Sequence, residues 1–319
     1  MKRILVCGAG GFIGTHLVRS LRAQGHYVIG ADLKFPEFSI TDANEFYQVD
    51  LRNQRSVTRL FKKDIDEVYQ LAADMGGAAF IFSGENDADI MHNSAIINLN
   101  ILHEMTFRKV PKIFYSSSAC IYPGHNQLDP DNPIMSEASA YPADPDSEYG
   151  WEKLFSERLY KSFERNYGID VRIGRLHNVF GPESAWIGGR EKAPAALCRK
   201  VLENDRAVDV WGPGTQTRSF MFIDECIEGI QRLMASDYNQ PINIGSARMI
   251  SINDLVRLIC KLADKELEIN NIPGPLGVMG RTSDNSLIQE VLSWEPPDNL
   301  ESGLKKTLEW IDVQRCGQT

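Results

Sequence analysis

Two kinds of residue pairing are missing from this sequence, and their absence excludes two kinds of site. The six cysteines include no Cys-x-x-Cys pair, and the six histidines include no His-x-x-x-His pair. Neither a disulfide framework nor a zinc site is therefore indicated. Unpaired thiols are typical of a reducing compartment, so we expect free cysteines and a cytoplasmic protein.

Long apolar runs are missing as well. No stretch approaches the roughly 18 apolar residues of a membrane-spanning helix, and Met1 leads into a strand pattern without a signal-peptide core between them. A formal net charge of −9 argues against a nucleic-acid-binding surface. We expect a soluble protein whose partners include neither a membrane nor a nucleic acid.

The residues that are present suffice for a large core. Hydrophobic residues make up 43% and charged residues 24% of the 319 positions, an ordinary composition for a globular protein of about two domains. Strand patterns alternate with helical patterns, which predicts an α/β fold with a Rossmann-like, doubly wound parallel sheet. The predicted strands are 4–7, 27–31, 46–51, 67–73, 112–115 and 171–175, and helices are predicted at 54–61 and 88–107.

A glycine-rich turn joins the first strand to the first helix. The glycines permit a tight turn and close approach of a pyrophosphate to backbone amides, and the helix N-terminus adds partial positive charge. An ordinary strand-to-helix turn is the alternative, but strand, turn, helix and second strand follow in the order of a dinucleotide-binding fingerprint. The cofactor contacts expected in this turn are Gly8, Gly11, Phe12, Ile13 and Gly14.

The second strand ends at an acidic residue, Asp32. A carboxylate at this place can accept both hydroxyls of a ribose and would repel a 2′-phosphate, which favours NAD over NADP. Lys34, two residues later, weakens that preference. The ends of the next two strands supply further expected cofactor contacts, namely Asp50, Leu51, Leu71, Ala72 and Ala73.

Tyr149 and Lys153 lie four residues apart in a helical pattern, so they share one helix face. A free tyrosine has a pKa of about 10, and a fixed neighbouring cation favours the phenolate and lowers that pKa. Tyr149 would then take a proton from a substrate alcohol while Ser118, at a strand end, holds the same oxygen. The alternative is a half-buried tyrosine and a solvated lysine that meet by chance on an amphipathic helix.

The glycine turn, Ser118, Tyr149 and Lys153 together resemble the extended short-chain dehydrogenase/reductase family in their order and spacing. The resemblance implies that Tyr149 is the acid/base for alcohol oxidation. It further implies that Lys153 lowers the pKa of Tyr149 and binds the nicotinamide ribose, and that NAD stays bound.

Further blocks resemble one group within that family, the GDP-mannose 3′,5′-epimerases. These blocks are 73–77, 117–123, 175–178, 188–194, 216–220 and 280–285. The resemblance implies that GDP-mannose is oxidised at C4, epimerised at C5 and C3 and reduced again, giving GDP-L-galactose with some GDP-L-gulose. It implies that Cys120 and Lys192 exchange the carbon-bound protons and that Arg281 binds the pyrophosphate. The residues it assigns to the substrate are Gly76, Ser118, Cys120, Asn178, Glu191, Lys192, Ala193, Arg218 and Arg281.

The chemistry of a cysteine and a lysine suits that reaction. A ketone at C4 acidifies both adjacent C–H bonds, so groups on opposite faces of the sugar can remove one proton and return another. Nearby cations favour a thiolate, and desolvation lowers the pKa of a lysine. The alternatives are a small buried hydrophobe at Cys120, a solvated lysine at Lys192, and surface salt bridges for Arg218 and Arg281.

Three other functions remain open. A sugar-nucleotide 4,6-dehydratase would carry an Asp-Glu pair after the strand-end serine, where this chain has Ala119-Cys120. A simple 4-epimerase on another nucleotide sugar would need no second acid/base pair, and a non-catalytic NAD-sensing module would need no activated phenol. The departures from the 3′,5′-epimerase pattern, around Ala78-Ala79 and 82–85 and at Trp151, concern the fine sugar specificity and the ratio of products rather than the reaction class.

The second half of the chain begins with a segment rich in Gly and Pro, which predicts loops, and strand and helix patterns follow it. We expect an NAD-binding domain of residues 1–176 and 215–247, and a sugar-nucleotide-binding domain of residues 177–214 and 248–319. The two domains are interleaved in sequence.

Smaller signals concern helix ends and assembly. Asp224, Ser251 and Asn299 are expected to cap helix N-termini. The apolar helix 90–105 either pairs two copies or covers the sheet as core, and its periodicity does not decide between them. We expect a homodimer.

Overall fold

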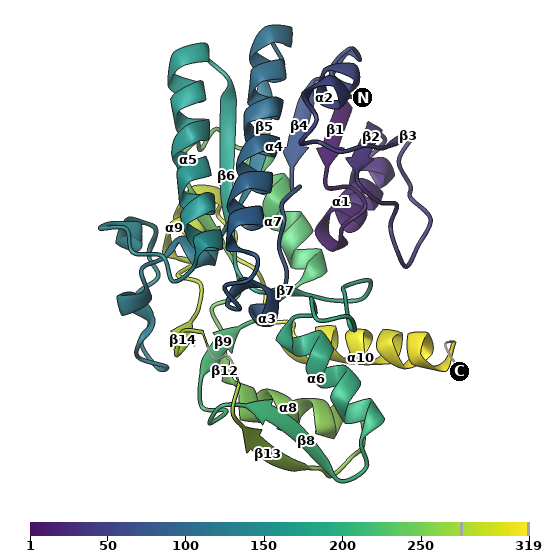
Figure 1. Cartoon of the computed structure of the whole chain (residues 1–319), viewed down its shortest axis with the longest axis vertical. Coiled ribbons are helices and arrows are strands. Elements are labelled where there is room, and N and C mark those ends of the chain that lie inside the picture. Colours follow the sequence, from purple (N-terminus) through teal and green to yellow (C-terminus); the bar gives the residue numbers. More distant parts are fainter. Residues whose placement is uncertain (275–276, 318–319) are drawn as a thin grey trace.

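The computed structural model describes residues 1–274 and 277–317. Its centre is a seven-stranded parallel sheet with the strand order β11-β6-β5-β4-β1-β2-β3 (Figure 1). The strands are β1 (Arg3–Cys7), β2 (Tyr27–Asp32), β3 (Glu45–Gln48), β4 (Glu67–Gln70), β5 (Lys112–Ser118), β6 (Asp170–Leu176) and β11 (Ile242–Ile244). The predicted Rossmann-like fold is confirmed. The strand order reverses between β1 and β4, where open α/β sheets place their ligands.

Helices cover both faces of this sheet. One face carries α1 (Phe12–Ala23) and α7 (Ile223–Ala235), and the other carries α2 (Gln54–Leu60), α4 (Asp87–Arg108) and α5 (Glu148–Tyr167). Side chains of a strand alternate between faces, so Ile4 and Val6 enter one hydrophobic cluster while Leu5 enters the other. Both faces are buried, which explains why the strands are almost continuously apolar.

A smaller part built on the second half of the chain lies below the sheet in Figure 1. It contains α6 (Ala193–Glu203), α8 (Ile252–Leu262), α10 (Leu300–Cys316) and the paired strands β8 (Ala207–Trp211) and β13 (Glu268–Ile272). A three-stranded sheet orders β12 (Met249–Ser251), β9 (Thr217–Ser219) and β14 (Gly280–Arg281). Residues 177–214, which the sequence predicts to be loops, also contain α6 and β8. Strand β8 is short and exposes alternate residues, so its apolar signal is weak.

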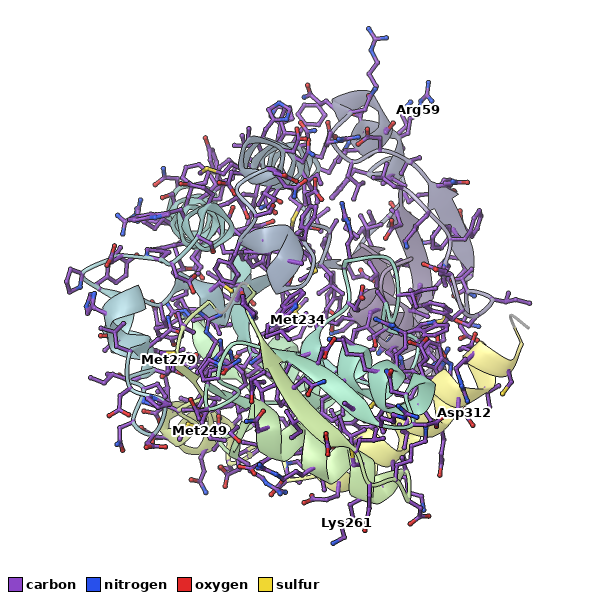
Figure 2. All side chains as sticks on the ribbon, turned by 60° about the horizontal axis from the view of Figure 1, so that its bottom comes forward. Arg59, Met234, Met249, Lys261, Met279 and Asp312 are labelled. Carbon is purple, nitrogen blue, oxygen red and sulfur yellow. The ribbon has the colours of Figure 1, made fainter. Side chains whose placement is uncertain are left out.

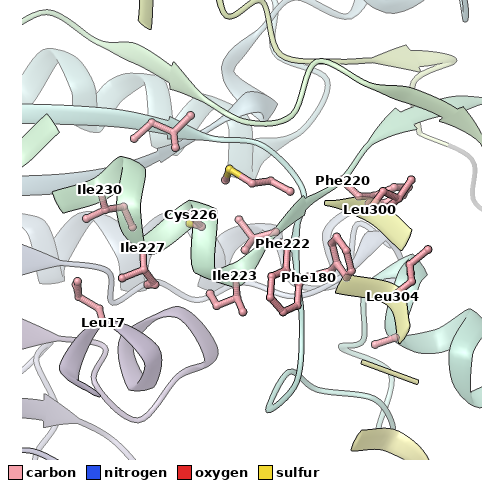
Figure 3. Packing of buried hydrophobic residues seen from close by; sticks show 14 of the residues in the cluster. Leu17, Phe180, Phe220, Phe222, Ile223, Cys226, Ile227, Ile230, Leu300 and Leu304 are labelled. Atoms are coloured by element: carbon pink, nitrogen blue, oxygen red, sulfur yellow. The ribbon is translucent and has the colours of Figure 1, made fainter. Parts of the chain in front are cut away.

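One hydrophobic cluster joins the two parts. Figure 3 shows Leu17 of α1 near α7 on one side, and Phe180, Phe222 and Leu304 packed together on the other. Phe180 belongs to β7 (Val179–Phe180) and Phe222 to β10 (Met221–Phe222), two short strands that pair in parallel. Because α10 packs on this pair, the sheet and the smaller part share one core.

The helices present polar faces to solvent. In Figure 2, Arg59 and Lys261 project outward at opposite ends of the view, whereas Met234 of α7 lies inside. Within the described ranges, no helix combines the length and the apolar character that crossing a bilayer requires.

Helix α8 begins as predicted, with Ser251 accepting a bond from the Asp254 amide at 3.0 Å. Two other expected caps differ. Asp224 lies in the first turn of α7 rather than at its cap. Asn299 is the N-cap residue of α10 as expected, but its side chain donates to Glu225 at 2.7 Å and makes no capping bond.

Candidate active site

Two adjoining cavities open where the strands of the large sheet end. The dinucleotide cavity, about 710 Å³, lies over the glycine turn. The catalytic cavity, about 420 Å³, lies between the end of β5, α5 and the smaller part. Ile13, Leu71 and Lys192 line both cavities, so groups bound in the two would meet there.

The glycine turn has the shape that a dinucleotide requires. Gly8 has a φ of +85°, in the left-handed region that favours glycine. A Cβ at Gly14 would lie 1.9 Å from the Gly8 carbonyl oxygen, and one at Gly10 would lie 2.0 Å from the Lys34 carbonyl oxygen. Helix α1 begins with no side-chain cap and no acidic residue in its first turn, so its amides are available to a pyrophosphate. These features fit NAD.

Asp32 is held in place by backbone amides. It accepts bonds from Gly10 N at 2.9 Å and Lys34 N at 3.2 Å, and burial raises the pKa of its carboxyl. The Lys34 ammonium pairs with Glu37 at 3.2 Å, which reduces its attraction for a 2′-phosphate. The remaining predicted cofactor contacts outside α5 all line the same cavity: Gly8, Gly11, Phe12, Ile13, Gly14, Asp50, Leu51, Leu71, Ala72 and Ala73.

Tyr149 and Lys153 lie one turn apart on α5 and face the end of β5. The Lys153 ammonium is 5.7 Å from the centre of the Tyr149 ring and donates to the Ser116 carbonyl at 2.8 Å. Both side chains are buried, and both line the catalytic cavity together with Ser118. The structure therefore brings the predicted trio together.

The protonation of Tyr149 differs from the expectation. Burial raises the pKa of the Tyr149 phenol well above its ordinary value, and a hydrogen bond with Ser118 opposes that rise. Burial also lowers the pKa of Lys153, which Glu152 opposes. The spacing of Tyr149 and Lys153 predicts a lowered pKa for the phenol, whereas burial, the largest effect on Tyr149, raises it.

Cys120 and Lys192 both line the catalytic cavity and come from different elements. Cys120 lies in the 3₁₀ turn η1 (Ala119–Ile121), directly after β5, and its amide donates to the Ser118 hydroxyl at 3.2 Å. Lys192 is the N-cap residue of α6 and is half-buried. Burial lowers the pKa of the Lys192 ammonium, and the Cys120 thiol opposes that effect. The two groups are thus electrostatically coupled.

The remaining predicted substrate residues gather around the same cavity. Arg218 donates to the carbonyls of Thr217 at 2.7 Å and Val278 at 2.6 Å, and burial lowers the pKa of its guanidinium to about 10. Asn178 donates to the Ser219 carbonyl at 3.0 Å. The cavity lining includes all nine predicted residues: Gly76, Ser118, Cys120, Asn178, Glu191, Lys192, Ala193, Arg218 and Arg281.

Arg281 has partners that the sequence analysis missed. Its Nη1 donates to Cys120 Sγ at 3.1 Å, its Nη2 to Asp146 Oδ2 at 2.9 Å and its Nε to Gln127 Oε1 at 2.6 Å. Asp146 and Gln127 carry no local motif, and they lie 135 and 154 positions from Arg281 in the chain. Only their proximity in the fold identifies them.

Comparisons with known proteins agree with this geometry. The sequence pattern of the NAD dependent epimerase/dehydratase family matches residues 4–245. A GDP-mannose 3,5-epimerase 1 of Oryza sativa subsp. indica is 48% identical over 98% of this chain and 82% of its own length. A GDP-mannose 3,5-epimerase of Arabidopsis thaliana is 46% identical with the same coverage.

Solved structures with this architecture include other sugar-nucleotide enzymes. UDP-glucose 4-epimerase from Thermotoga maritima has a TM-score of 0.85 at 27% identity, with 98% of this chain and 99% of that chain covered. UDP-glucuronic acid 4-epimerase from Bacillus cereus, solved with UDP-glucuronic acid and NAD, has a TM-score of 0.83 at 27% identity and the same coverage.

Proposed function

Because the chain belongs to the NAD-dependent epimerase/dehydratase family, we propose that it epimerises GDP-mannose at C5 and C3 by way of a transient C4 ketone. The products are GDP-L-galactose and GDP-L-gulose. One observation carries the proposal: a second acid/base pair, Cys120 and Lys192, lines the same cavity as Tyr149. The rice and Arabidopsis relatives, similar over 98% of the chain, support the choice of substrate.

NAD is the cofactor of this family. When bound, NAD supplies a reversible hydride acceptor for C4 of the sugar and a positively charged nicotinamide ring. The glycine turn and the N-terminus of α1 would hold its pyrophosphate, and the Asp32 carboxylate would accept hydrogen bonds from the hydroxyls of one ribose. Lys153 of α5 would bind the other ribose.

Tyr149 moves the proton of the C4 hydroxyl. Burial raises the pKa of Tyr149, which favours the neutral phenol that donates its proton when the ketone is reduced. In the oxidation direction, the hydrogen bond with Ser118 and the nearby Lys153 ammonium stabilise the phenolate. Ser118 also orients the C4 oxygen.

Cys120 and Lys192 exchange the protons on the carbons beside the ketone. Burial lowers the pKa of Lys192, which favours the neutral amine that can act as a base. Cys120 returns or removes the second proton. Ala119-Cys120 stands where a dehydratase would need two carboxyl groups, and a 4-epimerase would not use the pair.

Assembly and location complete the proposal. Met91 and Leu99 of α4 and Trp151 and Phe155 of α5 are exposed apolar side chains on two neighbouring helices. We propose that this face pairs two copies into a homodimer in the cytoplasm, where the six unpaired cysteines stay reduced. The division into a cofactor-binding and a substrate-binding domain remains a prediction.

The test is to incubate the purified enzyme with GDP-mannose in D₂O and to locate deuterium on the sugar by NMR. We expect label at C5 and C3 with galacto- and gulo-configured products. Label at C5 alone would restrict the product, and no label would favour another nucleotide sugar or the NAD-sensing module.

A matched variant tests the acid/base pair in the same assay. Cys120→Ala keeps the dinucleotide cavity intact, so NAD should bind with unchanged affinity while the deuterium exchange falls by about 100-fold or more. Cys198→Ala, a buried cysteine of α6 outside the cavity lining, is the control and should retain exchange. Unchanged exchange in Cys120→Ala would remove Cys120 from the mechanism.

A further inference from the structure

A buried guanidinium touches the sulfur of Cys120. Arg281 directs Nη1 at Cys120 Sγ, 3.1 Å away, and its other two contacts are Gln127 Oε1 at 2.6 Å and Asp146 Oδ2 at 2.9 Å. The Arg281 side chain is 7% exposed and that of Asp146 is 11% exposed. Three donors of one planar group are thus engaged by three residues from different segments, which leaves the group little freedom to rotate.

The two oxygen partners are themselves held firmly. Gln127 is fully buried at the end of the 3₁₀ turn η2 (Gly124–Gln127), and its Nε2 donates to the carbonyls of Tyr122 at 3.1 Å and Pro123 at 3.2 Å. That orientation turns Oε1 toward Arg281. Asp146 directly precedes Ser147, the N-cap of α5, so its position is tied to the helix that carries Tyr149.

Cations predominate around the Cys120 sulfur. Arg281 of β14 touches it, and Lys192 of α6, Lys153 of α5 and Arg218 of β9 all interact with its charge. The phenol of Tyr149 also faces it, and Asp146 is the carboxylate that acts on both Arg281 and Arg218. Among these cations, Arg281 is the one whose hydrogen bond reaches the sulfur.

We propose that Asp146 and Gln127 are positioning residues that hold Arg281 against Cys120, so that Arg281 serves proton transfer at the sulfur rather than only the diphosphate. This inference rests on the proposed function. The N–H donor stabilises the thiolate, which is the basic form of the group. When the thiolate removes a proton beside the C4 ketone, the C–H bond breaks, an S–H bond forms, and the electron pair passes to the enolate oxygen.

The experiment measures the reactivity of Cys120 without turnover. Wild type and Asp146→Asn are treated with iodoacetamide across pH 6 to 9, and the alkylation rate of each cysteine is followed by mass spectrometry. Cys316 is exposed, so its alkylation rate serves as an internal reference for the activity of the reagent in every sample. Asp144→Asn is the matched control, because Asp144 is an exposed carboxylate two residues earlier.

The direction in which Asp146→Asn changes the alkylation rate of Cys120 distinguishes two roles of Asp146: holding Arg281 in place, or only offsetting its charge. If Asp146 holds Arg281 in place, Asp146→Asn releases the guanidinium from the sulfur, and Cys120 alkylation at pH 7.5 slows about fivefold. If Asp146 only offsets the charge of Arg281, its removal leaves alkylation unchanged or faster, which overturns the proposal. Cys316 and Asp144→Asn should behave as in wild type in either case.

Two further measurements complete the test. Arg281→Lys cannot donate to three partners in one plane, so it should slow Cys120 alkylation even where Asp146→Asn fails to fold; a wild-type rate there would overturn the proposal. In the D₂O assay, Asp146→Asn should lower kcat more than it raises KM, whereas a pure diphosphate role for Arg281 predicts the reverse. If wild type shows the alkylation pattern but exchanges no deuterium, the proposed substrate fails while the positioning of Cys120 stands.

Discussion

At the scale of single residues, burial decides the protonation states of the catalytic cavity. It raises the pKa of Tyr149 and lowers those of Lys153 and Lys192, so each of these groups is pushed toward its neutral form. A neutral phenol can donate a proton and a neutral amine can accept one, so burial favours the donor form of Tyr149 and the acceptor form of Lys192. The chemistry proposed here therefore depends on how deeply the side chains are buried.

Burial also shifts the pKa of His177, and this shift affects the stability of the protein rather than catalysis. Its side chain is 1% exposed, its Nε2 lies 3.1 Å from Asn243 Oδ1, and burial lowers its pKa to about 4. An unfolded histidine has a pKa of about 6.5, so between these values the unfolded state binds more protons than the folded state. The contribution of His177 to stability is therefore present above pH 6.5 and is lost as the pH falls toward 4, by up to about 3 kcal/mol.

Urea unfolding at pH 7.5 and pH 5 measures this effect. The free energy of unfolding of wild type should fall between these pH values, and the fall should be smaller in His177→Gln. His125 is exposed, and His125→Gln should keep the full wild-type dependence. An identical pH dependence in His177→Gln and wild type would refute the assignment.

At the scale of elements, the junctions between strands and helices build the site. The turn after β1 forms the dinucleotide cavity, the turn after β5 carries Cys120, and the first residues of α5 and α6 carry Tyr149 and Lys192. In a parallel sheet all these junctions meet at the carboxyl edge. Residues far apart in sequence thereby converge on one volume.

The glycine turn should tolerate no side chain at Gly14. A Cβ there would lie 1.9 Å from the Gly8 carbonyl oxygen, so Gly14→Ala must displace the turn from the start of α1. We expect NAD affinity to fall at least tenfold in a titration monitored by calorimetry, because the amides no longer converge on the pyrophosphate. Gly317→Ala, at a φ of −78° in the last turn of the chain, is the control and should bind NAD normally.

At the scale of the whole molecule, one core ties the C-terminal helix to the sheet. Leu304 of α10 is fully buried in the cluster that contains Phe180, Phe222 and, at its other end, Leu17 of α1 (Figure 3). A shared core couples the two parts of the chain energetically. The catalytic cavity lies between these two parts, so its shape depends on the hydrophobic core that they share.

Leu304→Ala tests that coupling. Removing a fully buried leucine should cost about 2–5 kcal/mol of unfolding free energy, and unfolding followed by circular dichroism and by tryptophan fluorescence should remain one transition. Val313→Ala, on the exposed side of the same helix, should cost less than about 0.5 kcal/mol. Two separate transitions in wild type would contradict a shared core.

Much of this protein is determined by local sequence. The period of apolar residues marked the strands of the large sheet, and the order of strand, glycine turn and helix predicted the cofactor fold because those signals lie within about 30 consecutive residues. The prediction that Tyr149 and Lys153 share one helix face likewise requires only their four-residue spacing and the helix period. The resemblance of several short blocks then indicated the family.

Other properties were decided only by the tertiary structure. The pKa of Tyr149 follows chiefly from burial, which depends on every element packed around the phenol and outweighs the opposing hydrogen bond with Ser118. The contacts of Arg281 with Cys120, Asp146 and Gln127 join segments that no local pattern connects. Sequence determines which elements form because their interactions are short in range, whereas packing determines which side chains meet and how much water they lose.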